Sequence, residues 1–299
     1  MSELRPSTPV ARPASARRRS DAPPEVAPPN PDELERIERH LVSLPVHEGG
    51  SVTEDAALGV VMVRRPRAGN GQEYAALPRW RDAEGPAALA RVRERMRAEG
   101  AWPCLIVTDR PGRPPAWEGS LPAAGWLPVS RERIMWVGQA AVVPHLDPAL
   151  RIEAVQARSV ALHEALERRI FGLGADQAER RREALAAALA TGGLRAYVVR
   201  AADEPVAVAR LSQGEGVAAL VGIGVVPEHR RQGLGRLITI IATRAGLAGG
   251  NRLVWLSVEE GDAPAAALYE SLGFRPAFSW TRWLEADDRG AGSDRLGVR

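Results

Sequence analysis

The fold of this chain is decided by the stretch VVPEHRRQGLGR, residues 225–236. The apolar run 217–226 leads into it, and Pro227 ends that run. After the basic loop, apolar side chains recur at the spacing of one helical face, at Leu234, Leu237, Ile238, Ile241, Ala242 and Ala245. The sequence therefore predicts a strand, a basic loop with two glycines, and a helix whose apolar face packs on a sheet.

The start of that helix has the properties of an anion-binding site. The first turn of a helix carries unpaired N–H groups and the positive end of the helix dipole. Gly233 and Gly235 leave the backbone accessible, and Arg230, Arg231 and Arg236 add charged donors. For the loop alone, an ordinary strand-to-helix turn is an equally good explanation. A P-loop and a dinucleotide-binding loop are excluded, because the sequence lacks their glycine and Lys-Ser/Thr patterns.

Two further elements follow in a fixed order. Residues 252–258, RLVWLSV, predict a buried strand, and residues 262–269, DAPAAALY, predict a short helix capped by Asp262 with an early proline. Gly273 suits the end of that helix. The pattern Arg230-x-x-Gly233-x-Gly235, followed by these elements, resembles the acetyl-CoA motif of the GNAT superfamily of N-acetyltransferases. The resemblance covers residues 150–285.

The resemblance implies an α/β (α+β) fold with a mixed, mostly antiparallel twisted sheet flanked by helices, in tandem. It implies acetyl-CoA as the co-substrate, with backbone groups of Val225 and Val226 facing the pantetheine arm and the Arg230 side chain near the phosphates. The pyrophosphate would be held by backbone N–H groups of Arg231, Gln232, Gly233, Leu234, Gly235 and Arg236. Where the family usually has an asparagine that contacts the cofactor arm or the strand, this chain has Asp262.

The implied reaction is transfer of the acetyl group to a primary amine of a small molecule, by direct attack in a ternary complex. Tyr269 occupies the position of the family's general acid, and its alternative role is packing. The general base is open: Glu259, Glu260 or Glu215 acting through water, or ordered water alone, since a protonated amine must lose a proton first. Two other functions stay open, a CoA-binding or interaction module with little turnover and a protein N-terminal or lysine acetyltransferase.

The chain divides into five segments by composition. Residues 1–30, rich in Pro and Arg, predict a disordered tail, and 286–299 a flexible tail. Residues 31–142 predict a GNAT-like domain, 143–149 a linker, and 150–285 the catalytic domain. The 31–142 domain resembles a second copy of the catalytic domain. We expect this copy to be degenerate, because an R-x-x-G-x-G pattern is missing between residues 58 and 99. If this copy completes the acceptor site, we expect a monomer, with a homodimer as the alternative.

Composition excludes several other classes. All 40 basic residues are arginines, and 37 acidic residues balance them, so nucleic-acid binding is not expected. Apolar runs are too short to cross a bilayer, and the N-terminus lacks an apolar signal core, which predicts a cytoplasmic protein without membrane contact. The five histidines are scattered, so no metal site is expected. Cys104 lies in an apolar run and is predicted to be a buried strand residue.

Overall fold

The computed structural model describes residues 26–48, 50–66, 72–80, 85–111, 116–143 and 147–286. Its helices are α1 (Pro31–Ser43), η1 (Leu44–Glu48), α2 (Gly85–Ala98), η2 (Ala116–Ser120), η3 (Ala157–Ser159), α3 (Val160–Phe171), α4 (Ala175–Ala190), η4 (Pro227–His229), α5 (Leu234–Ala248) and α6 (Ala263–Ser271). Its strands are β1 (Ser51–Asp55), β2 (Val60–Pro66), β3 (Gln72–Pro78), β4 (Cys104–Thr108), β5 (Trp126–Val137), β6 (Leu150–Ala154), β7 (Leu194–Ala201), β8 (Glu204–Gly214), β9 (Val217–Val225), β10 (Val254–Glu259) and β11 (Arg275–Glu285).

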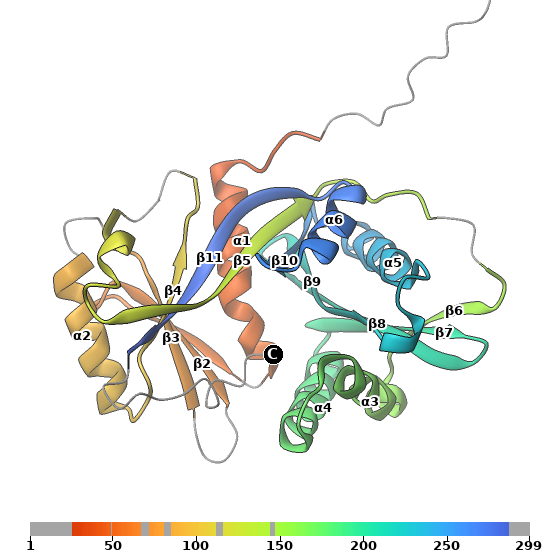
Figure 1. Ribbon diagram of the computed structural model, residues 1–299, viewed down its shortest axis with the longest axis horizontal. Helices are drawn as coiled ribbons and strands as arrows, with labels where there is room; N and C mark the ends of the chain where they lie inside the picture. Colours follow the sequence, from red (N-terminus) through yellow and green to blue (C-terminus); the bar gives the residue numbers. More distant parts are fainter. Residues whose placement is uncertain are drawn as a thin grey trace, which may run out of the picture.

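These strands form one continuous sheet across both halves of the chain. The order is β1-β2-β3-β4-β11-β5-β10-β9-β8-β7-β6. Most neighbours are antiparallel, and the two parallel contacts are β3 with β4 and β10 with β9. In Figure 1, strands β2, β3 and β4 lie on one side of the molecule, and strands β6, β7 and β8 of the same sheet lie on the other. The expected mixed, mostly antiparallel sheet flanked by helices is confirmed.

The two halves exchange strands at the centre of the sheet. β5, from the first half, lies between β10 and β11 of the second half, with pairs from Val254–Val137 to Glu259–Glu132 on one edge. β11 in turn pairs with β4, from Trp280–Thr108 to Leu284–Cys104. Figure 1 shows β5 and β11 side by side where they bridge the halves. The predicted boundary at residues 142–150 therefore divides the chain into two halves but does not divide the sheet, because strands of each half pair with strands of the other.

Helices cover both faces of this sheet. α5 packs on one face with Ala218, Leu220 and Val254, while α1 packs on the other with Ala219 and Trp255. α1 also crosses the joint between the halves, because its Leu34 and Ile37 join the cluster around Trp255 whereas its Val42 joins a cluster on β2 to β4. α3 and α4 lie on the α1 face, at a distance from α1 (Figure 1). The α1 face is thus lined by two separate helical segments.

The structure adds strands in the first half and contacts of the segment before α1. The structure includes β1 and β3, and it also describes residues 26–30 of the predicted tail. Val26 packs on the cluster around Trp255, and the Asn30 side chain accepts a hydrogen bond of 2.9 Å from the Glu33 N–H in a capping box. These contacts give the segment apolar burial and a helix cap, which composition alone did not reveal. Residues 1–25 and 287–299 lie outside the described residues, and Cys104 is buried as predicted.

Candidate active site at the divergence of β9 and β10

The site begins where two parallel strands diverge. β9 and β10 pair at Ala218–Val254, Ala219–Trp255 and Leu220–Leu256, and the pairing stops there. β9 continues to Val225 and β10 to Glu259. A bulge in β9 accompanies the divergence, since the register with β8 shifts between Val208 and Arg210. Facing strand edges that do not pair offer backbone groups to an extended ligand.

The bulge rests on a buried group of charged side chains. Gly222 adopts φ +62°, and a Cβ there would meet Arg210 Nε at 3.1 Å and Glu167 Oε1 at 3.2 Å. Arg210 and Glu167 form an ion pair at 3.1 Å with both side chains almost fully buried. His163 lies beside Glu167, and burial, with a smaller effect of Arg210, lowers the pKa of His163 to about 3. A neutral histidine and an ion pair therefore support the bulge.

The two valines at the end of β9 differ in what they offer. The Val226 N–H donates to the Val206 carbonyl at 2.9 Å, and its carbonyl accepts from the His229 N–H at 3.0 Å. Because hydrogen-bonding direction alternates along a strand, the backbone groups of Val225 point away from β8, toward the divergence. The Val225 carbonyl accepts from Arg230 Nε at 3.2 Å. The Val225 backbone groups thus face the divergence, whereas both backbone groups of Val226 form hydrogen bonds within the chain.

The loop between β9 and α5 has a strained and open backbone. Arg231 has φ +65°, which is uncommon for a residue other than glycine and concentrates at functional sites. Gly233 has φ +80°, a Cβ there would meet nothing within 4 Å, and it is the N-cap of α5 without a side-chain cap. The first-turn N–H groups of Leu234, Gly235 and Arg236 therefore have no N-cap side chain to satisfy them, which fits an anionic ligand.

Other loop and helix residues have structural contacts. Gly235 faces inward, since a Cβ there would meet Leu268 Cδ2 at 3.6 Å and Val225 Cγ2 at 3.7 Å. Arg236 donates to Ser271 Oγ at 2.9 Å and so ties α5 to the end of α6. Gln232, like Arg231, is exposed at the loop surface. Gly235 therefore packs against Leu268 and Val225, whereas the space beside Gly233 is open.

α6 follows β10 and brings Asp262 and Tyr269 to the same end of the site. Asp262 caps α6 by accepting from the Ala265 N–H at 3.0 Å. Tyr269 is buried and packs on Phe274 with ring centroids 5.9 Å apart. Burial, and secondarily the Asp262 carboxylate, raises the pKa of Tyr269 to about 12. The phenol therefore keeps its proton at neutral pH, as a general acid must.

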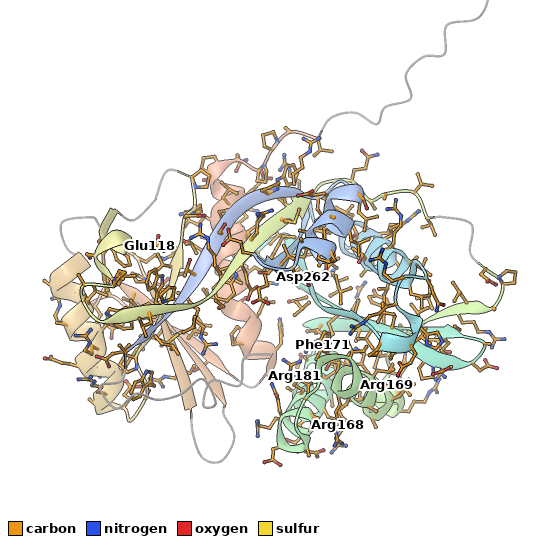
Figure 2. The ribbon with its side chains drawn as sticks, in the orientation of Figure 1. Glu118, Arg168, Arg169, Phe171, Arg181 and Asp262 are labelled. Atoms are coloured by element: carbon orange, nitrogen blue, oxygen red, sulfur yellow. The ribbon has the colours of Figure 1, made fainter. Side chains whose placement is uncertain are left out.

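A cavity of about 410 Å³ opens on the α1 face beside the divergence. Its walls come from α1 and η1 on one side, from α3 and α4 on another, and from sheet strands of both halves. Val221 and Gly222, the first β9 residues past the pairing, line it together with Ser257, the first such residue of β10. Figure 2 marks Phe171 and Arg181, both lining residues, on the helix pair below the sheet, and Asp262 near α6. The volume is in the range of small-molecule pockets.

A carboxylate that the sequence analysis missed lies in this cavity. Glu132 of β5 accepts a hydrogen bond from Ser257 Oγ, and Ser257 Oγ accepts from Trp280 Nε1 at 3.2 Å. All three residues line the cavity. The signal was present in the sequence, because Glu132 is in phase with Ile134 and Trp136, which face α1.

The three carboxylates considered as a base differ in their surroundings. Glu259 ends β10 opposite Glu132, exposed and outside the residues that line the cavity. Glu260 forms an ion pair with Arg131 at 3.4 Å. Glu215 lies in the turn before β9, paired with Arg39 at 3.1 Å, and the nine residues of β9 place it roughly 25 Å from Val225. The structure thus brings Tyr269 and the loop together, and it adds Glu132 and Ser257.

The far end of the cavity is held by a hydrogen-bonded chain. Trp255 Nε1 donates to His40 Nδ1 at 3.2 Å, so the His40 proton sits on Nε2, which lies 2.9 Å from Ser212 Oγ. Ser212 Oγ is 3.0 Å from Nε2 of His47, a lining residue. Burial, and secondarily His47, lowers the pKa of His40 to about 4. These hydrogen bonds fix α1 and η1 on the sheet.

The described residues contain neither a candidate metal cluster nor a candidate membrane-spanning helix. Within the described ranges, no group of three His, Cys, Asp or Glu side chains lies close enough together to hold a metal ion. None of the helices placed by the structure is long and apolar enough to cross a membrane.

Comparison with protein families matches residues 160–274 to the acetyltransferase (GNAT) family. The [Ribosomal protein bS18]-alanine N-acetyltransferase of Escherichia coli strain K12 is 43% identical over 60 residues, which is 20% of this chain and 40% of that enzyme. Mycothiol acetyltransferase of Thermobispora bispora is 40% identical over 76 residues, 24% of each chain. The chain thus spans less than half the length of either curated relative.

Solved structures are similar over much more of the chain. A GCN5-related N-acetyltransferase from Kribbella flavida has a TM-score of 0.62 at 22% identity, covering 84% of this chain and 96% of its own. A tandem GNAT protein from the clavulanic acid biosynthesis pathway has a TM-score of 0.56 at 20% identity, covering 75% and 78%. At these identities the likeness shows the fold, which is the expected tandem GNAT architecture.

Proposed function

We propose, from the match of residues 160–274 to the acetyltransferase (GNAT) family, that the chain transfers the acetyl group of acetyl-CoA to the primary amine of a small molecule. The observation that carries the proposal is the divergence of β9 and β10, which joins the open first turn of α5 to the cavity on the α1 face. One ligand can therefore have its phosphates at the loop and its reactive end at the cavity.

The residues fit acetyl-CoA in three respects. The first-turn N–H groups after Gly233 suit its pyrophosphate, and the arginines of the loop, Arg230 and Arg231, suit its other charges. The edge of β9 at Val225 suits the amide groups of the pantetheine arm. Acetyl-CoA supplies an activated acyl group and a thiolate leaving group. Tyr269 holds the proton that the thiolate needs, and its raised pKa keeps that proton in place until the transfer.

A small amine is favoured because the cavity is bounded by helices on two sides. α1 with η1 and α3 with α4 leave a pocket of about 410 Å³, which suits a compact acceptor. The similarity to a ribosomal protein alanine N-acetyltransferase favours a second acceptor class, the N-terminus of a protein. A monomeric chain in the cytoplasm, without nucleic acid or membrane partners and without a metal, completes the proposal.

The test is calorimetric titration of the full chain with acetyl-CoA, followed by thiol release from acetyl-CoA over a panel of primary amines and an alanine-starting peptide. We expect one binding site per chain, because only the second half has the loop, and thiol release with a small amine. Binding without thiol release over the whole panel would favour a CoA-binding module. Release with the peptide alone would favour the protein acceptor, and two sites per chain would contradict the degenerate first copy.

A further inference from the structure

We propose that Glu132, carried by the strand that the first half inserts, binds the ammonium group of the acceptor and takes its proton. The assignment rests on the proposed function and names its acceptor class: a primary amine joined to a compact apolar or aromatic body. It also gives the first half a direct part in the chemistry, because Glu132 lies outside residues 160–274, which match the family.

Position is the first argument. β5 lies beside β10, and Glu132 reaches Ser257, which is the first β10 residue beyond the last pair with β9. The cavity that Glu132 lines also includes Val221 and Gly222, which lie at the same level of β9. An acyl group delivered along the divergence would therefore enter the cavity next to this carboxylate, whereas the exposed Glu259 lies outside the residues that line the cavity.

Hydrogen bonding is the second argument. The indole N–H of Trp280 can only donate, so Ser257 Oγ accepts from it and must give its single proton to Glu132. This order holds Glu132 Oε2 as an acceptor and orients the carboxylate. A carboxylate held as an acceptor is ready to receive a proton from an ammonium group.

The lining of the cavity defines the rest of the acceptor. Apolar and aromatic side chains surround the carboxylate, among them Leu41, Phe171, Trp255 and Trp280. Such walls suit an apolar body, and aromatic faces also attract a cation. The small acceptor therefore needs one cationic end and one apolar end.

Charged and titratable neighbours frame the expected pH behaviour. Arg210 of β8, paired with Glu167 of α3, and Arg181 of α4 line the same cavity, as does His47 of η1. On β10, Glu259 is the strand partner of Glu132. On β11, the partner is Trp280, which is not titratable. The pH profile therefore has to separate the titration of Glu132 from that of these neighbours.

The proposed step balances. Glu132 takes a proton from the ammonium group, the neutral nitrogen forms a bond to the acyl carbon, and the carbon–sulfur bond breaks. The thiolate receives a proton from Tyr269, and the new amide nitrogen loses its second proton to water. Tyr269 is then protonated again from solvent, and Glu132 releases its proton to solvent. Ammonium and thioester thus give amide, thiol and one released proton.

The experiment compares the full-length native chain with Glu132→Gln and Ser257→Ala, and uses phenethylamine as the probe amine. Glu54→Gln, an exposed carboxylate on β1, is the matched control. We expect Glu132→Gln to keep its acetyl-CoA affinity within about 2-fold while thiol release at pH 7 falls about 100-fold, as for the loss of a general base. Ser257→Ala leaves the carboxylate present but not oriented, so we expect a loss of about 10-fold.

The pH profile separates a base from a merely structural residue. Because an alkyl amine loses its proton unaided near pH ~10, the Glu132→Gln defect should shrink as pH rises toward that value. If Glu132→Gln loses the same factor in thiol release at pH 6.5 and at pH 9.5, or keeps the native rate, the role of Glu132 as the base is overturned. The proposed function is not affected by either result. A defect confined to Glu259→Gln gives the role to Glu259.

Failure of the proposed function gives a different result. If the native chain does not bind acetyl-CoA, the proposed function is overturned, and this assignment falls with it. If the native chain binds acetyl-CoA but neither binds nor acetylates phenethylamine, the acceptor class and the role of Glu132 are overturned, while the other amines of the panel still test the transferase.

Discussion

The Arg210 guanidinium lies 3.1 Å from the Glu167 carboxylate, and a Cβ at Gly222 would lie only 3.1 Å from Arg210 Nε and 3.2 Å from Glu167 Oε1. The pair joins α3 to β8 below the bulge that starts the divergence of β9 from β10. Its position makes the bulge depend on two buried side chains, and one of them, Arg210, also lines the cavity. Stability and site geometry are therefore coupled at this point.

Glu167→Gln should lower the free energy of unfolding by about 3 kcal/mol, because it leaves the Arg210 charge buried without its counter-ion. The measurement is urea unfolding of the full chain. Glu153→Gln is the matched control, because Glu153 pairs with Arg200 at the same 3.1 Å but is exposed, and an exposed pair contributes about 0–1 kcal/mol. Equal effects of the two substitutions would contradict the buried ion pair.

The buried histidines predict acid sensitivity. The folded pKa values of His40 and His163 are lowered to about 4 and about 3 from an unfolded value of 6.5. The unfolded chain therefore binds more protons below pH 6.5, and stability is full above that pH and falls as the pH decreases toward 4. At pH 5 the loss is about 2 kcal/mol per histidine. Urea unfolding between pH 8 and pH 4.5 measures it.

His163→Gln removes one of these titrating groups and is the control for the acid sensitivity. The variant should be less stable than the native chain at pH 8, and it should lose less stability on acidification. Parallel pH curves for the two proteins would show that His163 does not contribute.

The two loop glycines should behave differently. Gly233→Ala places a side chain at φ +80°, which costs about 1–2 kcal/mol and adds a methyl group beside the open first turn of α5. We expect acetyl-CoA affinity to fall at least about 10-fold, equivalent to 1.4 kcal/mol. Gly235→Ala only makes contacts of 3.6 and 3.7 Å and should bind nearly as the native chain does. Calorimetric titration with acetyl-CoA measures both affinities. A larger loss of affinity in Gly235→Ala than in Gly233→Ala would contradict the proposed role of the loop.

Tyr269→Phe should lower thiol release about 100-fold, because the thiolate loses its proton donor. Acetyl-CoA affinity should stay within about 2-fold, because the substitution removes only the buried hydroxyl and leaves the loop residues unchanged. With a pKa of about 12, Tyr269 should cause no fall in the native rate between pH 7 and pH 10. An equal loss of affinity and rate would mean that Tyr269 is a packing residue.

Cleavage of the chain within residues 143–149 should not separate the two halves. β5 is held between β10 and β11, and β11 is also held by β4, so the fragments share the centre of one sheet. A protease site introduced there should give two fragments that elute together in size-exclusion chromatography. Separate elution of folded fragments would show that each half completes its own sheet.

Local patterns predicted the elements well but not their neighbours. The loop at 225–236 was visible because Gly233 and the apolar face of α5 are features of adjacent residues. The place of β5 was not, because its partners lie more than 100 residues away and its Arg131-Glu132-Arg133 sequence is typical of an exposed strand. Glu132 was overlooked for that reason, although its phase with Ile134 marks the buried face. Tryptophans 255 and 280, rather than those of the first half, line the cavity for the same non-local reason.

The exchange of β5 and β11 also has a consequence for synthesis on the ribosome. β4 and β5 are made long before β11, which ends at residue 285, so the first half emerges with unpaired strand edges. Domains usually fold in turn as they are made, but here the centre of the sheet must wait for nearly the whole chain. Long-range pairing of this kind slows folding, and any early stop in translation would leave an incomplete sheet prone to associate with other chains.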